Sequence, residues 1–432
     1  MKKLLIVCYD FPPVGGVPVQ RVIKFAKYLR EFDVTPIVFT NAHGLGHSID
    51  ESLLELDYVK QTKVIRYGGT NLVKFHKLRH QQRLPSHPHY YYLGLKSILF
   101  MDHYSAWYFE VKREILRIAQ EEDIDCVFTT APPHSTHLLG KYLKDKLGIP
   151  WIMDMRDAMV QHVDSKEPAF VTFLKKKVEM PYEKRFCNNA DAVITVSQPM
   201  LDAMIKRCPI LKGKSSVITN GFDEEDFNHL PSYEKEVSDK LVVAYTGTLQ
   251  GTQTPQYFFE GLSILVKSKR INPDDLLLRF VGYIEDGYKK IAESLIKVMT
   301  IEFLGFKNHK QALSYQLKTD VLLLVTAPNT GIGADAVMTG KVFEYLRAGH
   351  PIFALAPDGP LKNLIEDGRF GVVVPPNDSK AVADGFEKIY LEWKNNNGKL
   401  SYHPDITIMD RYNRKHLTQQ LAEIVEQVTQ KS

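Results

Sequence analysis

The sequence predicts an α/β protein of two doubly wound domains that face each other across a cleft. Short apolar runs alternate with segments of helical periodicity along the chain, a pattern typical of parallel sheets covered by helices. The alternation stops once, at a polar and acidic stretch of low periodicity, residues 223–240. On each side of that stretch, a glycine-bearing loop follows the first predicted strand. The two halves are therefore expected to share one architecture.

The first half, residues 1–225, is predicted to form the N-terminal domain. The opening apolar run resembles the start of a signal peptide, but it is short and Tyr9 and Asp10 end it, so we interpret it as a buried strand. The strands of this half are expected at residues 4–8, 35–40, 63–66, 126–130, 151–155, 192–196 and 216–219, and its helices at 19–30, 106–120, 134–146, 175–189 and 198–207.

After a linker at residues 226–240, the second domain is predicted to span residues 241–407. A last helix, within residues 408–432, lies beyond any strand and is expected to pack elsewhere. The strands of the second half are expected at residues 242–246, 276–282, 301–304, 321–325, 352–355 and 371–374, and its helices at 255–267, 287–300, 309–317, 341–348, 360–366 and 379–394.

The composition suits a soluble globular protein of about two to three domains, because 44% of the 432 residues are hydrophobic and 25% are charged. A net charge of +4 is too small to indicate nucleic-acid binding, and no recognition motif accompanies it. The four cysteines form no C-x-x-C pair, so reduced thiols are expected. No apolar run approaches the roughly 18 residues of a membrane-spanning helix. We therefore expect a cytoplasmic protein, at most peripheral to the inner face of a membrane.

Residues 339–354 form the most informative segment, which has the pattern of a loop, a short helix and a strand. Gly349 is the expected stop of the helix, so Gly340 and Lys341 fall at its N-terminus, where free N–H groups and the helix dipole favour a phosphate. Glu344 projects from the same face as Lys341, and a carboxylate beside a phosphate site suits the hydroxyls of a ribose or a sugar. The alternative is a capped surface helix with a solvated Lys341–Glu344 pair.

Two glycine-bearing loops occupy equivalent places in the two halves. Gly15 and Gly16 lie between a predicted strand and a predicted helix, where backbone without side chains can approach a ligand phosphate. Gly247 and Thr248 follow the first strand of the second half. The first loop lacks the Gly-x-Gly-x-x-Gly pattern, which argues against a nicotinamide cofactor. The alternative for that loop is a turn that needs a positive φ.

Polar residues at two further strand ends are candidates for catalysis or for binding an acceptor. Asp157 is expected to orient an acceptor hydroxyl, and Arg156 to meet an anionic group. Alternatively, Arg156 pairs with Asp154 or Asp157 in a purely structural cluster. His134 also follows a strand end, and its alternative role is in helix capping or packing.

No metal or cofactor is expected. Gly340 and Lys341 lack the earlier glycine and the following Ser or Thr of a P-loop, and no His/Cys cluster has the spacing of a metal site. Basic and aromatic residues at 74–92, together with lysines at 175–177, suit an anionic membrane surface or a lipid-phosphate acceptor. The alternative is a solvent-exposed insertion.

Short motifs in characteristic order make residues 1 to about 392 similar to the glycosyltransferases of family 4, also described as glycosyl transferase group 1. They are Phe11-Pro-Pro-Val-Gly-Gly16, Pro132-Pro-His134, Asp154-Met-Arg-Asp157, Ala190-Asp-Ala-Val-Ile-Thr-Val-Ser197, Asn220-Gly-Phe-Asp223, Thr246-Gly-Thr-Leu249, Phe280-Val-Gly282, Gly340-Lys-Val-Phe-Glu-Tyr-Leu-Arg-Ala-Gly349 and Gly371-Val-Val-Val-Pro375.

This resemblance implies the GT-B fold, two Rossmann-like domains, and a retaining, metal-independent transferase. It implies a nucleotide-sugar donor, with Glu344 at the ribose, Lys341 near the diphosphate and the loop of Gly15 and Gly16 meeting the donor. The acceptor groups would come from the first domain, onto which the last helix would pack back. The acceptor is expected to be a glycan or a lipid-linked molecule in surface polysaccharide or glycoconjugate assembly.

The sequence departs from the family at two places that usually hold the donor. The first glutamate of the Glu-x7-Glu motif is replaced by Ala336, and no basic residue follows the second glycine loop at 250–253. Asp335, Lys341 or backbone amides are expected to substitute for them. Two other functions stay open from the sequence: a nucleotide-sugar 2-epimerase of the same fold, and a non-catalytic nucleotide-binding scaffold in a glycan-assembly complex.

Overall fold

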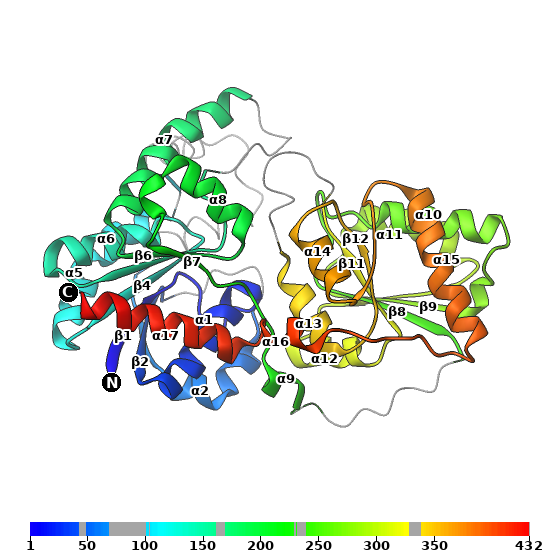
Figure 1. Ribbon diagram of the computed structural model, residues 1–432, viewed down its shortest axis with the longest axis horizontal. Helices are drawn as coiled ribbons and strands as arrows, with labels where there is room; N and C mark the ends of the chain where they lie inside the picture. Colours follow the sequence, from blue (N-terminus) through cyan, green and yellow to red (C-terminus); the bar gives the residue numbers. More distant parts are fainter. Residues whose placement is uncertain are drawn as a thin grey trace, which may run out of the picture. The chain divides into compact units, whose positions relative to one another are not determined.

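The computed structural model describes residues 1–42, 49–68, 101–102, 104–160, 169–228, 230, 239–327 and 338–431. The chain divides into two compact units, an N-terminal unit of Met1–Asn220 with Arg414–Ser432 and a C-terminal unit of Gly221–Asn413. Each unit contains one parallel sheet with helices on both of its faces (Figure 1). The predicted class of two doubly wound α/β domains is confirmed.

The sheet of the N-terminal unit has the strand order β3-β2-β1-β4-β5-β6-β7. The order reverses between β1 and β4, so the carboxyl ends of these two strands form the switch point where doubly wound sheets bind ligands. The strands are β1 Lys2–Val7, β2 Val34–Thr40, β3 Lys63–Arg66, β4 Cys126–Ala131, β5 Trp151–Met155, β6 Ala192–Thr195 and β7 Ser215–Val217.

The two faces of this sheet bury alternate residues of each strand, as period-2 geometry requires. Leu4 and Ile6 pack in the core beneath α1 and α17, whereas Leu5 and Val7 pack in the core beneath α5, α6, α7 and α8. A short helix, α2, spans Asp57–Lys60. The larger helices are α1 Val17–Tyr28, α5 Ser105–Glu121, α6 Thr136–Leu147, α7 Ala169–Asn189, α8 Gln198–Arg207 and α17 Arg414–Gln430.

The sheet of the C-terminal unit has the order β10-β9-β8-β11-β12-β13, which reverses between β8 and β11. Its switch point therefore lies at the carboxyl ends of β8 and β11. The strands are β8 Leu241–Thr246, β9 Leu276–Val281, β10 Thr300–Gly305, β11 Val321–Val325, β12 Ile352–Leu355 and β13 Gly371–Val374.

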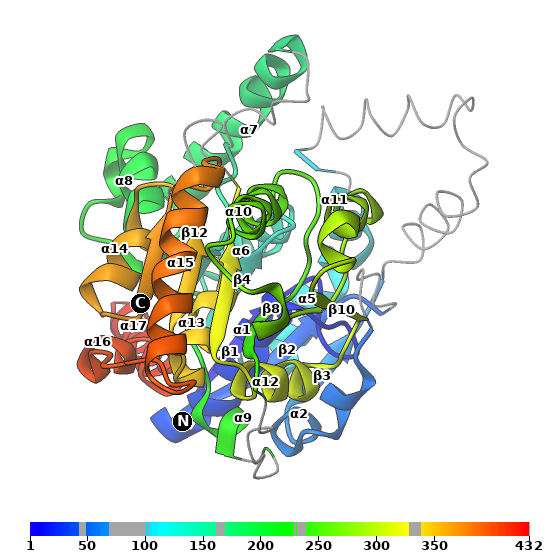
Figure 2. The ribbon, with the colours of Figure 1, turned by 90° about the vertical axis from the view of Figure 1, so that its right-hand side faces the viewer.

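Helices cover both faces of the second sheet. On one face, α10 and α15 lie side by side although they are far apart in the sequence (Figure 2), and α11 completes the layer. The other face is covered by α12, α13 and α14. The helices are α10 Gln256–Lys267, α11 Asp286–Ile296, α12 His309–Leu317, α13 Gly340–Ala348, α14 Pro360–Asp367 and α15 Ser379–Asn395.

A predicted helix of the second half and the predicted linker differ from the structure. The helix expected at 287–300 ends at Ile296, because Thr300 already pairs with Leu277 of the neighbouring strand. The stretch expected to be an irregular linker contains the short helix α9, Glu224–Asn228. Asp223 accepts a hydrogen bond from the Glu225 N–H at the start of this helix, which is why a polar sequence becomes helical there.

The predicted last helix is in fact two helices that belong to different units. α16, Ile406–Asp410, packs against α13 in the C-terminal unit, and α17 packs against α1 in the N-terminal unit. Between them, the Tyr412 ring packs against the Phe343 ring at a tilt of 42°, with ring centroids 4.9 Å apart, and the Tyr412 carbonyl oxygen accepts a hydrogen bond from the Phe222 N–H. These contacts take the chain out of helical geometry, so the expected continuous helix from residue 408 is wrong.

Candidate functional site

In the C-terminal unit, the candidate residues from distant parts of the sequence come together at the switch point. Gly247 and Thr248 directly follow β8, and Lys341 lies in the first turn of α13, which follows β11. The Lys341 Nζ is 3.5 Å from the carbonyl oxygen of Thr248. The loop after β8 and the N-terminus of α13 therefore form one local site.

The Lys341 ammonium lies over this loop and not beside Glu344. It donates a hydrogen bond to the Tyr245 hydroxyl and lies 4.6 Å from the centroid of the Tyr245 ring. Burial lowers the pKa of Lys341 to about 8, against the opposing effect of Glu344. The expected alternative, a solvated Lys341–Glu344 surface pair, is therefore not what the structure forms.

Gly247 is the residue that makes room for this lysine. Its φ is 123°, and a Cβ there would lie 2.9 Å from the Lys341 Nζ and closer still to its Cε. Gly282, at the end of β9, also has a φ of 123°, and a Cβ there would collide with the carbonyl oxygen of Gly247. A glycine thus directly follows each of these two neighbouring strands. The absence of a Cβ at both positions lets the loop after β9 approach the loop after β8, and lets Lys341 approach the loop after β8.

The helix after the loop begins as the sequence predicts. Thr339 is the N-cap of α13, and its hydroxyl accepts a hydrogen bond from the Lys341 N–H at 3.2 Å. Gly340 is the first helical residue, and Gly349 ends the helix in the left-handed conformation with a φ of 78°. The positive end of the helix dipole and the Lys341 ammonium therefore coincide, which favours an anion at this place.

Glu344 is held by two residues of α12. Its Oε1 is 3.0 Å from the His309 Nε2, and its Oε2 accepts a hydrogen bond from the Gln316 Nε2 at 3.1 Å. About a quarter of the Glu344 side chain is exposed, 26% by surface area, so the carboxylate is fixed but still reachable. Sequence reasoning missed His309, Gln316 and Tyr245 because each looks like an ordinary helix or strand residue until the fold brings it to α13.

In the N-terminal unit, Gly15 and Gly16 lie between β1 and α1 at the other switch point. Gly16 has a φ of 99° and is the N-cap of α1, with its carbonyl oxygen accepting from the Val19 N–H at 3.1 Å. A residue with a Cβ rarely adopts that φ, so the positive-φ turn of the alternative interpretation is present. The approach of a ligand phosphate to this loop stays a prediction.

Arg156 does not form the expected cluster with Asp154 or Asp157. Its Nε donates to the carbonyl oxygen of Ala131 at 2.9 Å and its guanidinium also reaches the Pro132 carbonyl oxygen at 3.1 Å. Asp154 instead forms a fully buried ion pair with Arg21, at 2.8 Å, and accepts a hydrogen bond from the Thr130 hydroxyl. Arg21 therefore takes the structural role that the sequence suggested for Arg156.

His134 lies beside Arg156 at the end of β4. Burial, with a smaller effect of the Arg156 guanidinium, lowers the pKa of His134 to about 4. The ring is therefore neutral near pH 7, and its Nδ1 is buried without a hydrogen-bond partner in the described part of the chain. Asp157 is exposed, and its side chain forms no hydrogen bond or ion pair with the described residues.

Several expectations fall outside the described residues, namely those on Asp335, Ala336, the stretch 74–92 and the side chain of Lys175. The four cysteines are buried and form no disulfide. Among the described residues, no three His, Cys, Asp or Glu side chains gather as a metal site requires. None of the described helices combines the length and apolar character that a membrane crossing needs.

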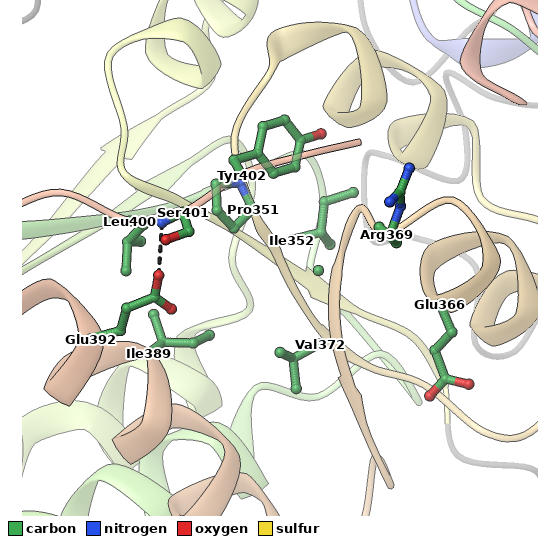
Figure 3. A pocket seen from close by; sticks show the side chains of 11 residues that line it. Pro351, Ile352, Glu366, Arg369, Val372, Ile389, Glu392, Leu400, Ser401 and Tyr402 are labelled. Carbon is green, nitrogen blue, oxygen red and sulfur yellow. Dashed lines mark hydrogen bonds between the residues drawn. The ribbon is translucent and has the colours of Figure 1, made fainter. Parts of the chain in front are cut away.

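A pocket of about 390 Å³ lies at the opposite edge of the C-terminal sheet, at the amino ends of β12 and β13 (Figure 3). Ile352 and Gly371, the first residues of these strands, line it, and one wall is held by a 2.7 Å hydrogen bond from the Ser401 N–H to Glu392. None of the candidate residues lines this pocket, so it is separate from the site at the switch point.

Comparison of the sequence with models of known protein families identifies the family. The model of Glycosyltransferase Family 4 matches residues 14–226, and the model of Glycosyl transferases group 1 matches residues 227–401. The chain belongs to the group 1 glycosyltransferases. It is therefore an enzyme of the glycosyltransferase type, as the resemblance implied. No curated protein sequence gives a significant match.

Solved structures show the same fold along the whole chain. HepE of Anabaena, in complex with UDP and glucose, has a TM-score of 0.64 at 17% identity and covers 99% of this chain and 100% of its own. A glycosyltransferase from Rickettsia africae has a TM-score of 0.64 at 15% identity, covering 100% and 99%. A TarM variant of S. aureus, in complex with Fondaparinux, alpha-GlcNAc-glycerol and UDP, has a TM-score of 0.61 at 10% identity, covering 98% and 100%. These likenesses confirm the GT-B fold.

Proposed function

We propose that this glycosyltransferase moves a hexosyl or N-acetylhexosaminyl group from a nucleoside-diphosphate sugar to a hydroxyl of a glycan or lipid-linked acceptor, with retention at the anomeric carbon. The observation that carries the proposal is the convergence of the Lys341 ammonium with the N-terminus of α13 over the Gly247 loop. Two sources of positive potential at one switch point suit the diphosphate of a donor. HepE, which shares the fold, was crystallised with UDP and glucose.

Lys341 would replace the basic residue that is missing after the second glycine loop. Its side chain reaches that loop from α13. Its ammonium lies 3.5 Å from the carbonyl oxygen of Thr248, which lies just before the stretch 250–253 where the basic residue is missing. As the sugar–phosphate bond breaks, negative charge develops on the diphosphate. The ammonium and the helix N-terminus would stabilise that charge, an effect typically worth about 100- to 1000-fold in rate.

The acceptor would be oriented by residues of the N-terminal unit. Asp157 is exposed and suited to accept a hydrogen bond from an acceptor hydroxyl. His134 is neutral near pH 7, so it would orient the acceptor and would not donate a proton to it. Arg156 would meet an anionic group of the acceptor. Without a strong nucleophile among these groups, attack would occur on the same face as the leaving diphosphate, through an oxocarbenium-like species.

The mechanism needs no metal ion, because Lys341 and the helix N-terminus supply the positive charge that a metal would supply elsewhere. Transfer that continues at full rate in EDTA would support this part of the proposal. A rate that falls in EDTA and returns with added Mg²⁺ or Mn²⁺ would contradict it. We also propose a cytoplasmic place of action with peripheral contact at the inner membrane face.

The test uses Lys341→Ala and Glu344→Gln with a panel of UDP-, GDP- and TDP-sugars and a hydroxyl acceptor. We expect transfer to fall by about 100-fold or more in Lys341→Ala. Lys362→Ala is the matched control, because Lys362 is a surface lysine of α14 that pairs with the exposed Asp358. Unchanged donor turnover in both site variants would sink the proposal.

Two outcomes would replace the proposal with another function. Interconversion of a UDP-sugar in the absence of an acceptor would identify a 2-epimerase of the same fold. Donor binding by calorimetry, with neither hydrolysis nor transfer on long incubation, would identify a nucleotide-binding scaffold. A thermal-shift screen chooses the donor first, since a ligand at 100 times its Kd adds about 2.7 kcal/mol to the stability of the folded state.

A further inference from the structure

The carboxylate of Glu344 is held at both oxygens by a single helix. His309 is the first residue of α12 and Gln316 is seven positions later, so both project from the same face two turns apart. His309 meets Oε1 at 3.0 Å, and Gln316 meets Oε2 at 3.1 Å. A carboxylate held at one oxygen can rotate, whereas one held at both has a fixed plane.

The Gln316 amide has only one workable orientation. The side chain is fully buried, and its Nε2 donates both to Glu344 and to the Thr246 hydroxyl at 3.0 Å. A carboxylate accepts hydrogen bonds only, so the nitrogen must face Glu344. The buried Oε1 of Gln316 then has no partner among the described residues.

The same network reaches the phosphate end of the site. The Thr246 hydroxyl and N–H both donate to the Tyr345 hydroxyl, at 3.3 and 2.9 Å, so the last residue of β8 is tied to α13. Gly247, which makes room for Lys341, follows directly. The first turn of α12 is also fixed, because Asn308 and Gln311 form a reciprocal capping box there. Glu344 is thus positioned by α12 and α13, which are fixed by the capping box and by the contacts of Tyr345.

We propose that His309 and Gln316 are positioning residues that make Glu344 select a ribonucleoside diphosphate over its 2′-deoxy counterpart. The inference rests on the proposed function, in which the donor diphosphate lies at Lys341, because a carboxylate beside that phosphate site suits the hydroxyls of the donor ribose. A carboxylate with a fixed plane presents its two oxygens to two neighbouring hydroxyls at once. A carboxylate that rotates takes one hydroxyl from either sugar, so it gives ribose no advantage.

The experiment compares the Kd of UDP, GDP and ADP with those of their 2′-deoxy forms by calorimetry. For the wild type we expect the ribonucleotide that binds best to bind on the order of 10- to 100-fold more tightly than its 2′-deoxy form. Gln316→Met keeps the volume and removes the donor, and His309→Phe removes the second donor at a half-buried position. In both variants we expect the preference to fall to about threefold or less, through weaker ribonucleotide binding and unchanged 2′-deoxynucleotide binding.

Two further variants separate positioning from stability. His309→Gln keeps a donor and should keep most of the preference, and Lys310→Ala, at an exposed position of the same helix, should leave it unchanged. If Gln316→Met fails to fold, His309→Phe decides alone. Folded variants with the wild-type preference, or a wild type without any preference, overturn this inference and leave the proposed function standing. A wild type that binds TDP but none of the three ribonucleotides overturns this inference alone, and one that binds none of the four nucleotides overturns the proposed function itself.

Discussion

The candidate residues of the two units are held in place by different means. In the C-terminal unit, side chains hold one another: Tyr245 holds Lys341, and His309 and Gln316 hold Glu344. In the N-terminal unit, Arg156 is held by backbone carbonyls, and Asp157 is exposed without a side-chain partner in the described part of the chain. The C-terminal candidate residues form a preorganised network of side chains. The N-terminal candidate residues are polar side chains that no hydrogen bond links to one another among the residues that the structure describes.

This difference matches what each unit would bind under the proposed function. A nucleoside diphosphate has one fixed set of groups, so a network tuned to its charge and hydroxyls gains affinity without any ordering at the moment of binding. Acceptors differ from one another, and a loosely held carboxylate adapts to them. The comparison therefore predicts strong, specific effects of substitutions in the C-terminal network and effects limited to the acceptor at Asp157.

The largest effect, a loss of stability, is expected outside both candidate sites, at the buried Arg21–Asp154 pair. Asp154→Asn leaves the Arg21 guanidinium buried without its countercharge, which typically costs about 3–5 kcal/mol in the free energy of unfolding. Urea unfolding of the N-terminal unit measures this loss. Glu121→Gln, which removes a surface partner of Arg117, is the control and should leave the midpoint unchanged.

The double variant Arg21→Met with Asp154→Leu sharpens this prediction. Replacing both charges by apolar groups of similar size removes the unpaired charge, so it should recover much of the stability lost in Asp154→Asn. A double variant that is as unstable as the sum of its parts would contradict the view that Asp154 is a structural residue paired with Arg21.

Gly247→Ala is expected to have the next largest effect. Its methyl group would need the space of the Lys341 side chain, at a φ that alanine rarely adopts. We expect transfer to fall by about 100-fold, because the ammonium moves away from the diphosphate. Gly251→Ala is a control for substitution in the same loop, since a Cβ at Gly251, whose φ is 62°, would meet nothing within 4 Å. Equal losses in both variants would show that a general disturbance of the loop, and not the space taken from Lys341, is responsible.

The sequence was sufficient where local rules decide. Periodicity predicts the strands β3, β5, β11, β12 and β13 with their observed bounds, and the stop of α13 at Gly349 follows from its glycine. Prediction from the sequence failed where contacts with distant residues determine the bounds of an element. Helical periodicity continues past Asp410, but contacts of Tyr412 and Asn413 with Phe343 and Phe222 break the helix.

The same limit applies to the site. Lys341, Glu344 and Gly247 could be chosen from the sequence, because helix ends and strand ends have recognisable residues. Their partners could not: Gln316 lies 28 positions before Glu344 and Tyr245 lies 96 before Lys341. The alternative pairing of Arg156 with Asp154 or Asp157 follows from their closeness in the sequence. The actual partner of Asp154 is Arg21, which lies 133 positions away.

The pH dependence of donor binding gives a smaller and more specific effect. The pKa of Lys341 is about 8 in the free protein because of burial, so the ammonium population falls above that pH. An anionic diphosphate binds the charged form, so its affinity should fall by up to tenfold per pH unit above pH 8, with proton uptake on binding. Calorimetry with UDP between pH 7 and 9.5 measures this slope. Lys341→Met should bind more weakly at pH 7 and show no such slope; an unchanged slope in that variant would assign it to another group.

The smallest effect is expected for Asp157→Asn, which should change acceptor binding and leave donor binding unchanged. Asp157 is exposed and has no side-chain partner among the described residues, so the free energy of unfolding should change by less than about 0.5 kcal/mol. Loss of a charged acceptor for one hydrogen bond should raise the KM for the acceptor by about tenfold and leave the Kd of UDP unchanged. Asp202→Asn, at an exposed position of α8, is the control and should change neither quantity. Weaker UDP binding in Asp157→Asn would place Asp157 with the donor network and remove the contrast between the two units, because both would then act on the same ligand.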